Sequence, residues 1–255
     1  MPERYSPSCL HAYKNCPRQF KFAYIDLIET EEENIEAFIG SRVHEVMQKL
    51  YADLKTGKTN TLDELLEHYD AICRREWHSK VNVVKKKYTA KDYKDFGKRC
   101  IVNYYGKYAP FNDGETLGLE HRLEFFVDTE KKHKISGYID RIVKTGEGLY
   151  EVHDYKTSTR MPSDAEIEAD FQLALYQMGV QDMYADSRRV DLVWHYLSFN
   201  AEIRKNITPT ALDLIRVAVV KRIEEIERDT EFLPKESFLC RWCNFAKLCD
   251  ADGFI

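Results

Sequence analysis

The sequence predicts a mixed α/β fold in which helices cover one central sheet. Two observations carry this prediction. Apolar residues recur at helical spacing before Pro110, and after it the period changes to that of β-strands. The elements of the core then follow in the order helix, three strands, helix, strand. With 255 residues, of which 44% are hydrophobic, the chain can bury a sizeable core, and we expect one domain over residues 1–255.

The first third of the chain is predicted to be helical. Ser6-Pro7-Ser8 is a helix-start signal. A long amphipathic helix is expected over residues 35–54, because its apolar residues recur every three or four positions. An insertion from about residue 60 to 110 contains two further helices, since hydroxyl residues at Thr61 and Thr89 each precede an acid by three positions.

After Pro110, turn-like sequences separate short β-rich stretches, which suggests antiparallel hairpins. Helical patterns follow the third stretch and the fourth. The predicted order is strands at 117–127, 134–143 and 149–157, a helix at 163–184, a strand at 190–197 and a helix at 208–227.

Composition and charge limit the classes of partner. No apolar run approaches the roughly 20 residues of a membrane span, and the N-terminus does not look like a secretory signal. We therefore expect a cytoplasmic protein with no membrane partner. The net charge of −5 gives no overall attraction to a polyanion, but residues 80–99 hold eight basic residues and two acids. A surface that meets phosphate would show this pattern, and so would a solvated helix face.

Two acids and a lysine form the candidate catalytic group. Asp154 and Lys156 are two positions apart, so both point to one face of the third strand. Asp140 lies in the second strand, and hairpin pairing can bring it to the same end of the sheet. Two carboxylates with nearby carbonyl groups make a hard oxygen site suited to Mg²⁺ or Mn²⁺. A salt bridge in which Lys156 only neutralises the aspartates is the alternative.

These segments resemble the PD-(D/E)xK nuclease superfamily, and within it the RecB/AddB-type nucleases. The resemblance covers nearly the whole chain apart from the insertion, and it implies a restriction-endonuclease-like core with the same order of elements. Ile139 replaces the proline of the superfamily's name, and Asp154 stands where many relatives have Glu. The matching segments are Gly-Ser-Arg-Val-His at 40–44, Gly-Tyr-Ile-Asp-Arg-Ile at 137–142, His-Asp-Tyr-Lys-Thr at 153–157 and Gln-Leu-Ala-Leu-Tyr at 172–176.

The resemblance also implies roles for individual residues. Glu120 resembles, weakly, a further family carboxylate on the first strand. Lys156 would orient the attacking water and stabilise the transition state. The other implied roles are metal binding by His44, Asp140, Asp154 and the carbonyl of Tyr155, and DNA contact by Gln172 and Tyr176.

Four of the seven cysteines are candidates for a second metal centre. Cys240, Cys243 and Cys249 have the spacing C-x2-C-x5-C, and Cys16 is the expected fourth ligand. From the spacing alone, a Zn²⁺ site is favoured. The set also resembles the iron-sulfur subset of RecB-type nucleases, which implies a [4Fe-4S] cluster that staples residues 234–255 to the N-terminal segment. The other three cysteines are expected to be buried thiols.

The resemblance implies a Mg²⁺- or Mn²⁺-dependent deoxyribonuclease, an exonuclease acting on single-stranded or frayed DNA ends in repair or recombination. Without a motor domain, it would rely on a separate helicase, or on a recombination or integration protein. Two alternatives stay open: a CRISPR-adaptation nuclease that trims DNA before integration, and a catalytically silent DNA-binding scaffold that keeps an iron-sulfur cluster. Residues 52–59 fit a loose phosphate-loop pattern but end a helix, so nucleotide binding is not predicted.

Overall fold

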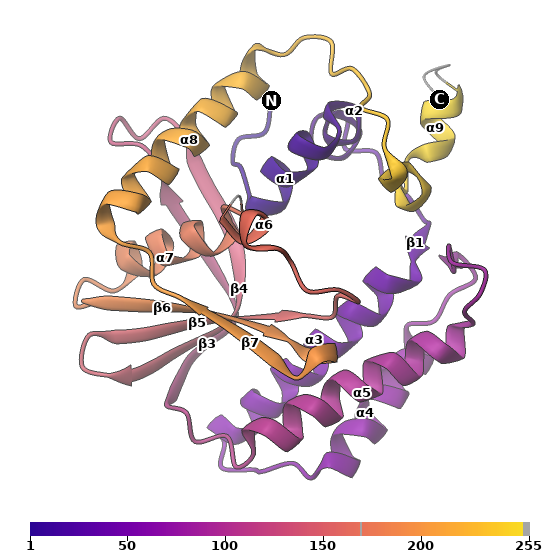
Figure 1. Ribbon diagram of the computed structural model, residues 1–255, viewed down its shortest axis with the longest axis vertical. Helices are drawn as coiled ribbons and strands as arrows, with labels where there is room; N and C mark the ends of the chain where they lie inside the picture. Colours follow the sequence, from indigo (N-terminus) through magenta and orange to yellow (C-terminus); the bar gives the residue numbers. More distant parts are fainter. Residues whose placement is uncertain (169, 252–255) are drawn as a thin grey trace.

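The computed structural model describes residues 1–168 and 170–251, and its centre is a five-stranded mixed sheet (Figure 1). The strands lie in the order β3-β4-β5-β6-β7, and only the β5–β6 pair is parallel. The three hairpin strands predicted after Pro110 are confirmed, as is the fourth. The bounds are β3 (Glu115–Phe126), β4 (Lys134–Gly146), β5 (Leu149–Lys156), β6 (Arg189–Tyr196) and β7 (Ala201–Lys205).

Strand β7 is absent from the sequence prediction. It has five residues and pairs only with β6, at the edge of the sheet. Edge strands often carry charged residues, which protect them from pairing with other chains, and three of its five residues are charged. A short charged stretch does not show the apolar alternation by which strands are recognised.

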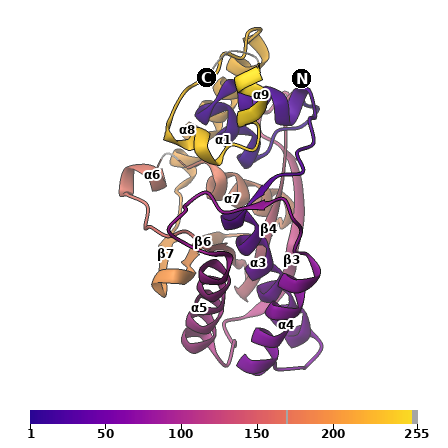
Figure 2. The same cartoon turned by 90° about the vertical axis from the view of Figure 1, so that its right-hand side faces the viewer.

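Helices cover the sheet, as predicted, and they do so on both of its faces (Figures 1 and 2). One face packs against the first helix and two later helices, and Tyr150 and Val152 of β5 belong to that core. The opposite face packs against the long helix and the insertion, and Tyr155 belongs to that second core. The helices of the first layer are α1 (Pro7–Asn15), α7 (Gln172–Met183) and α8 (Pro209–Arg228), and those of the second are α3 (Ile35–Lys55), α4 (Leu62–Arg75) and α5 (Ala90–Tyr108).

Helix α3 forms where its apolar stripe predicts it. Asn34 caps its start, because its side-chain oxygen accepts a 2.8 Å hydrogen bond from the backbone N–H of Ala37. Gly57 follows its end with a φ of +85°, a conformation that glycine adopts without strain. The capping boxes predicted at Thr61 and Thr89 are both present and begin α4 and α5.

The single helix predicted over 163–184 is wrong, because two helices, α6 (Asp164–Glu168) and α7, occupy this stretch. The side chain of Asp170 accepts a 2.8 Å hydrogen bond from the backbone N–H of Gln172. An aspartate that bonds the backbone in this way favours a helix start over a helix interior. Helix α7 therefore begins at Gln172, whose side chain lies in its first turn.

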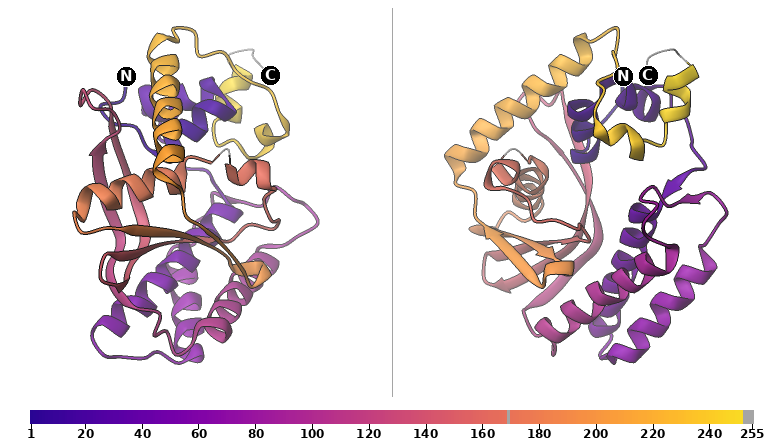
Figure 3. Two further views of the ribbon diagram at one scale, coloured as in Figure 1. Left: turned by 60° about the vertical axis from the view of Figure 1, so that its left-hand side comes forward. Right: turned by 45° about the vertical axis from the view of Figure 1, so that its right-hand side comes forward.

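The N-terminal helices and the last described segment lie at the same end of the molecule (Figures 1 and 3). The N-terminal part continues after α1 into α2 (Pro17–Phe20), and the C-terminal part contains a 3₁₀ turn at Phe238–Trp242 and α9 (Ala246–Ala251). In the two described ranges, no helix combines the length and apolar character needed to cross a membrane.

Candidate active site

The carboxylates of Asp140 and Asp154 lie where β4 and β5 stop pairing. The hydrogen-bonded ladder between these strands ends at the pair Arg141–His153, and the two aspartates are the next residues beyond that end, one on each strand. The backbone N–H of Tyr155 donates a 2.7 Å hydrogen bond to Oδ2 of Asp140. Because the ladder ends here, the N–H of Tyr155 has no partner on β4, and the carboxylate of Asp140 accepts its hydrogen bond instead. This bond holds the side chain of Asp140 in place.

Helix α3 brings His44 to the same position. Its Nε2 lies 2.8 Å from the carbonyl oxygen of Tyr155, and its Nδ1 lies 3.5 Å from Oδ2 of Asp140. Gly40, one helical turn earlier, allows this approach, because a Cβ atom there would lie 3.1 Å from Oγ1 of Thr157. The Gly-to-His spacing of the motif therefore packs α3 against the end of β5 and directs the imidazole at the carboxylate.

Glu120 completes a cluster of three potential metal ligands. The register of β3 against β4 places it across from Asp140. One ligand atom from each of His44, Glu120 and Asp140 lies within 4.8 Å of the other two, a grouping found once in the described part of the chain. Glu120 has a φ of +43°, a left-handed conformation that costs a residue with a side chain roughly 1–2 kcal/mol. Such strain persists only where the surrounding structure holds it, and it clusters at functional sites.

The cluster concentrates negative charge in a poorly solvated place, and the pKa values reflect this. Burial alone would lower the pKa of His44, but Asp140, Asp154 and Glu120 raise it to about 9. Burial raises the pKa of Asp154 to about 6 against the opposing charge of Lys156. Burial and repulsion by Asp140 also raise the pKa of Glu120. Carboxylate oxygens with one imidazole suit a divalent cation such as Mn²⁺ or Mg²⁺, which would relieve this repulsion.

Lys156 stands beside this cluster. Its ammonium lies 2.6 Å from Oδ2 of the buried Asp154, and it donates a 2.9 Å hydrogen bond to Oε1 of Gln172. The amide of Gln172 donates in turn to the hydroxyl of Tyr176 at 3.1 Å. Gly137 of β4 leaves room for that ring, since a Cβ atom there would lie 3.2 Å from it. Gln172 and Tyr176 therefore share the face of α7 that is turned to Lys156, whereas their contact with DNA stays a prediction.

The comparisons with known proteins agree with this geometry. The sequence profile of the PD-(D/E)XK nuclease superfamily matches residues 4–250, which is nearly the whole chain. The chain belongs to this superfamily. A search of curated protein sequences found no match to the nuclease.

The solved structures that are similar to the nuclease include the following two. One is a "putative exonuclease" from Eubacterium rectale, with a TM-score of 0.53 and 13% sequence identity, and the match covers 99% of this chain and 94% of that one. It shows a shared fold. The other is the protein SSO0001, with a TM-score of 0.38 and 16% identity over 75% of this chain and 98% of that one, a similarity too low for any argument.

The cluster of three side chains differs in one member from the metal ligands predicted from sequence, whose role stays a prediction. His44 and Asp140 are in the cluster of three, and the Tyr155 carbonyl lies beside His44. Asp154 is paired with Lys156 and lies outside that group, whose third member is Glu120. The weak match at Glu120 was its only sequence signal. The strand register and the left-handed backbone of Glu120 can be seen only in the three-dimensional structure.

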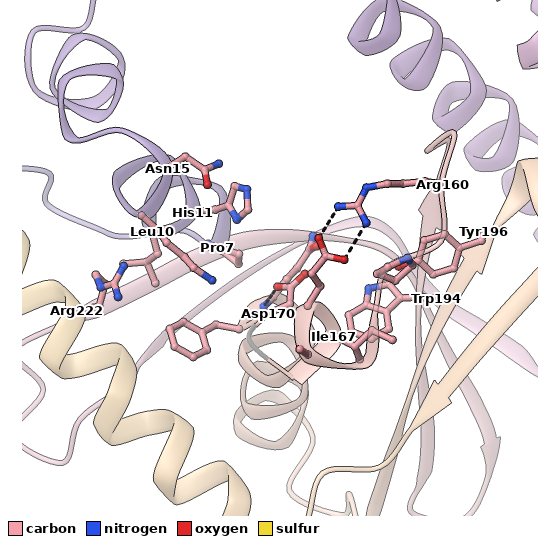
Figure 4. Close-up of a pocket in the computed structure, with 16 residues that line it drawn as sticks. Pro7, Leu10, His11, Asn15, Arg160, Ile167, Asp170, Trp194, Tyr196 and Arg222 are labelled. Carbon is pink, nitrogen blue, oxygen red and sulfur yellow. Dashed lines mark hydrogen bonds and ion pairs between the residues drawn. The ribbon is translucent and has the colours of Figure 1, made fainter. Parts of the chain in front are cut away.

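Two clefts border Gln172 on the surface of the nuclease. One, of about 560 Å³, contains Arg4 and Arg122 next to Tyr176. The other, of about 580 Å³, lies between α1 and the segment that carries α6, and Figure 4 shows His11 of α1 on one side of it and Arg160 on the other. Basic side chains therefore stand in the clefts that adjoin the Lys156–Gln172 pair.

A buried arginine supports the site from the opposite face of the sheet. Arg141, which follows Asp140, has no exposed surface, and its guanidinium lies 3.7 Å from the ring centre of Tyr51 on α3. It forms an ion pair with Asp113 and a 3.2 Å contact to Nδ1 of His153. A guanidinium this deeply buried needs such partners, since an unpaired charge would destabilise the fold by several kcal/mol.

The four cysteines predicted as metal ligands line one small cavity of about 40 Å³. Cys16 reaches it because Pro17 excludes helical backbone at the preceding residue, and Cys16 is extended with a φ of −158°. Backbone N–H groups of Lys235 and Ser237 donate to the sulfur atoms of Cys16 and Cys240 at 3.4 Å. No disulfide joins cysteines in the described residues, and the three cysteines outside this group, Cys9, Cys73 and Cys100, are buried as predicted.

Proposed function

We propose that this nuclease hydrolyses phosphodiester bonds in DNA with a divalent cation, Mg²⁺ or Mn²⁺, held at the cluster of His44, Glu120 and Asp140. The observation that supports this most directly is the convergence of these three side chains beside an Asp154–Lys156 pair. A salt bridge alone would explain Lys156 and Asp154. It would not explain why a strained glutamate and a histidine from α3 meet at the same place.

The residues divide the work of hydrolysis between them. A bound divalent cation supplies a water of lowered pKa and neutralises charge on the phosphate. His44, Glu120 and Asp140 would hold it, with Asp154 and the carbonyl of Tyr155 adjoining. Lys156, fixed between Asp154 and Gln172, orients the attacking water and stabilises negative charge that develops on the phosphate. Burial alone would lower the pKa of Lys156, but Asp154 and Asp140 raise it, so the side chain stays protonated.

Within this proposal, the nuclease is an exonuclease on single-stranded or frayed DNA ends. The exonuclease description of the Eubacterium rectale protein, which shares the fold, agrees with this mode. The clefts beside Gln172 contain arginines that a DNA backbone would contact in place of their present partners, which are Glu124 for Arg4 and Arg122 and Glu166 for Arg160.

Cleavage of labelled DNA tests the proposal. Linear and circular, single- and double-stranded substrates would be incubated with Mg²⁺, Mn²⁺ or chelator. We expect metal-dependent release of nucleotides from linear single strands and none from circles. Asp140→Ala, Asp154→Ala and Lys156→Ala should each abolish it, whereas Glu130→Ala, at an exposed hairpin position, should not. Substantial activity in a folded Asp140 or Lys156 variant would refute the assignment. DNA binding without any cleavage would favour the silent scaffold.

We also propose that the four-cysteine cavity holds a [4Fe-4S] cluster. Four soft thiol donors around one cavity fit a thiophilic metal centre. Tetrahedral Zn²⁺, at about 2.3 Å from each sulfur, would place the sulfurs roughly 3.8 Å apart. In the described ranges, no three of these sulfurs lie within 4.8 Å of one another, so they are more widely spaced than a tetrahedral Zn²⁺ site would hold them.

Metal analysis after anaerobic purification tests this second proposal. We expect a brown protein with broad visible absorption and about four irons per chain. Cys243→Ser should lose the iron, and Cys100→Ala, at a buried thiol outside the cavity, should keep it. A colourless protein with one zinc per chain would reject the cluster.

A further inference from the structure

A separate groove lies on the helical insertion. It has a volume of about 530 Å³ and is formed by the segment that leads into α5 and by the first half of α5. We call it the insertion groove. The side chains that concern the argument are Lys85, Lys87, Tyr88, Phe96 and Arg99, together with Thr159 from the segment after β5.

The groove has positive charges that its acidic residues do not neutralise. Its two acids already have partners, since Asp92 accepts hydrogen bonds in the capping box of Thr89 and Asp95 pairs with Lys91 at 2.8 Å. Across the described residues, no carboxylate lies within ion-pair distance of Lys87 or Arg99. Two exposed cations therefore stand in a hollow without a compensating charge, which favours an anionic ligand.

Aromatic rings lie directly beneath these cations. The Lys87 ammonium is 4.8 Å from the ring centre of Tyr88, and the Arg99 guanidinium is 5.7 Å from that of Phe96. Tyr88 is 44% exposed, and Phe96 is partly exposed. A solvated helix face accounts for the charges but not for exposed rings in a hollow. Alternating cations and rings are the two elements that hold single-stranded nucleic acid, by phosphate contact and by base stacking.

The groove adjoins the end of the strand that carries the candidate catalytic lysine. Thr159 lines the groove and follows Lys156 by three residues. Between them, Thr157 lies against Gly40 of α3, so this connecting segment is anchored to the helix that carries His44. A chain of nucleotides bound in the groove can thus continue along this segment towards the metal cluster.

We propose that the insertion groove binds single-stranded DNA, as an anchoring site for nucleotides away from the scissile phosphate. A duplex would satisfy the cations but could not offer its base faces to Tyr88 and Phe96, because its bases are stacked on each other. This inference rests on the proposed DNA substrate. Its test measures binding and therefore gives an answer independently of cleavage.

The test is fluorescence anisotropy with a labelled oligothymidylate of about 20 nucleotides, a length that exceeds one groove, at several salt concentrations in chelator. Lys87→Glu combined with Arg99→Glu should weaken binding at least about tenfold. The slope of log K against log salt concentration should also become shallower by roughly 1.4, the value expected for two lost phosphate contacts. Phe96→Ala should weaken single-strand binding at least about fivefold and leave duplex binding unchanged. Lys131→Glu makes the same charge change per residue at the exposed turn between β3 and β4, away from the groove, and should bind like the wild type.

Kinetics separate this inference from the proposed function. If the groove only anchors DNA, its variants should raise KM for long single strands and leave kcat unchanged. Melting temperatures close to that of the wild type establish that the variants fold, and Lys87→Gln with Arg99→Gln provides a milder pair. Unchanged binding in both pairs would overturn the inference, as would tighter binding of an RNA of equal length. Absence of cleavage by the wild type would refute the proposed function but not the groove.

Discussion

The imidazole Nε2 of His44 lies 2.8 Å from the carbonyl oxygen of Tyr155. This contact joins the middle of α3 to the end of β5, and it leaves Nδ1 facing Asp140 and Glu120 at 3.5 and 4.0 Å. A hydrogen bond at one ring nitrogen fixes the orientation of the other, as it does in many metal sites. The backbone of β5 therefore orients the histidine that the proposed cation requires.

His44→Ala should weaken Mn²⁺ binding by at least about tenfold, because it removes a ligand of the proposed cation. Isothermal titration with Mn²⁺ measures this directly. His78→Ala, at an exposed histidine elsewhere in the helical insertion, is the matched control and should bind Mn²⁺ normally. Equal affinity in the wild type and in His44→Ala would remove His44 from the site.

Gln172→Ala should lower kcat by roughly ten- to a hundredfold while Mn²⁺ affinity stays unchanged. The reason is that the amide oxygen accepts a charge-assisted hydrogen bond from Lys156, and such bonds contribute about 1.5–3 kcal/mol. Gln172 does not belong to the metal cluster. Single-turnover cleavage at saturating metal and DNA measures the change, and a variant that lost metal affinity with kcat intact would contradict this role.

Gly97→Ala should destabilise the fold by about 1–3 kcal/mol. A Cβ atom at this position would overlap the hydroxyl oxygen of the buried Tyr69 and lie 2.7 Å from its Cζ, and this overlap outweighs the gain of about 1 kcal/mol from alanine's helix propensity. Gly106 lies on the same helix with open space around it, so Gly106→Ala should stabilise by up to about 1 kcal/mol. Urea unfolding of the two variants decides whether α4 and α5 pack as closely as described.

Acid should destabilise the protein through two stacked histidines. Burial, followed by repulsion from Arg141 or from each other, lowers the pKa of His153 and His195 well below 6.5. Below pH 6.5 these histidines bind protons in the unfolded chain but not in the folded chain. Their contribution to the free energy of unfolding is therefore fully present above that pH and is lost as pH decreases. The slope is up to about 1.4 kcal/mol per pH unit for each histidine.

Urea unfolding between pH 7 and pH 5 measures this slope. His195→Gln should be less stable at pH 7, because it loses the contacts to His153 and Tyr108, but its acid slope should be shallower. The exposed His78→Gln is the control and should retain the wild-type slope. Identical slopes in the wild type and His195→Gln would show that this pair does not control the acid response.

The hairpin strands and the placement of Asp154 and Lys156 could be predicted because strand alternation alone determines them. Glu120 could not be assigned with equal strength, since its place depends on the register of a neighbouring strand and on a left-handed backbone. The division between α6 and α7 depends on a side-chain hydrogen bond of Asp170, which periodicity does not encode. Buried Arg141 looks like a surface residue in sequence, because its partners come from distant segments.

Arg141 contacts α3, β5 and the segment before β3 at once, and it does so directly beneath Asp140. Separation of any of these three elements would leave the buried guanidinium of Arg141 without one of its partners in an apolar interior. The backbone amides around this residue should therefore be among the last to exchange with deuterium, through opening of the whole molecule. The proposed reaction centre would then keep its shape between turnovers, and the adjustments needed to admit and release DNA would fall on the surrounding clefts.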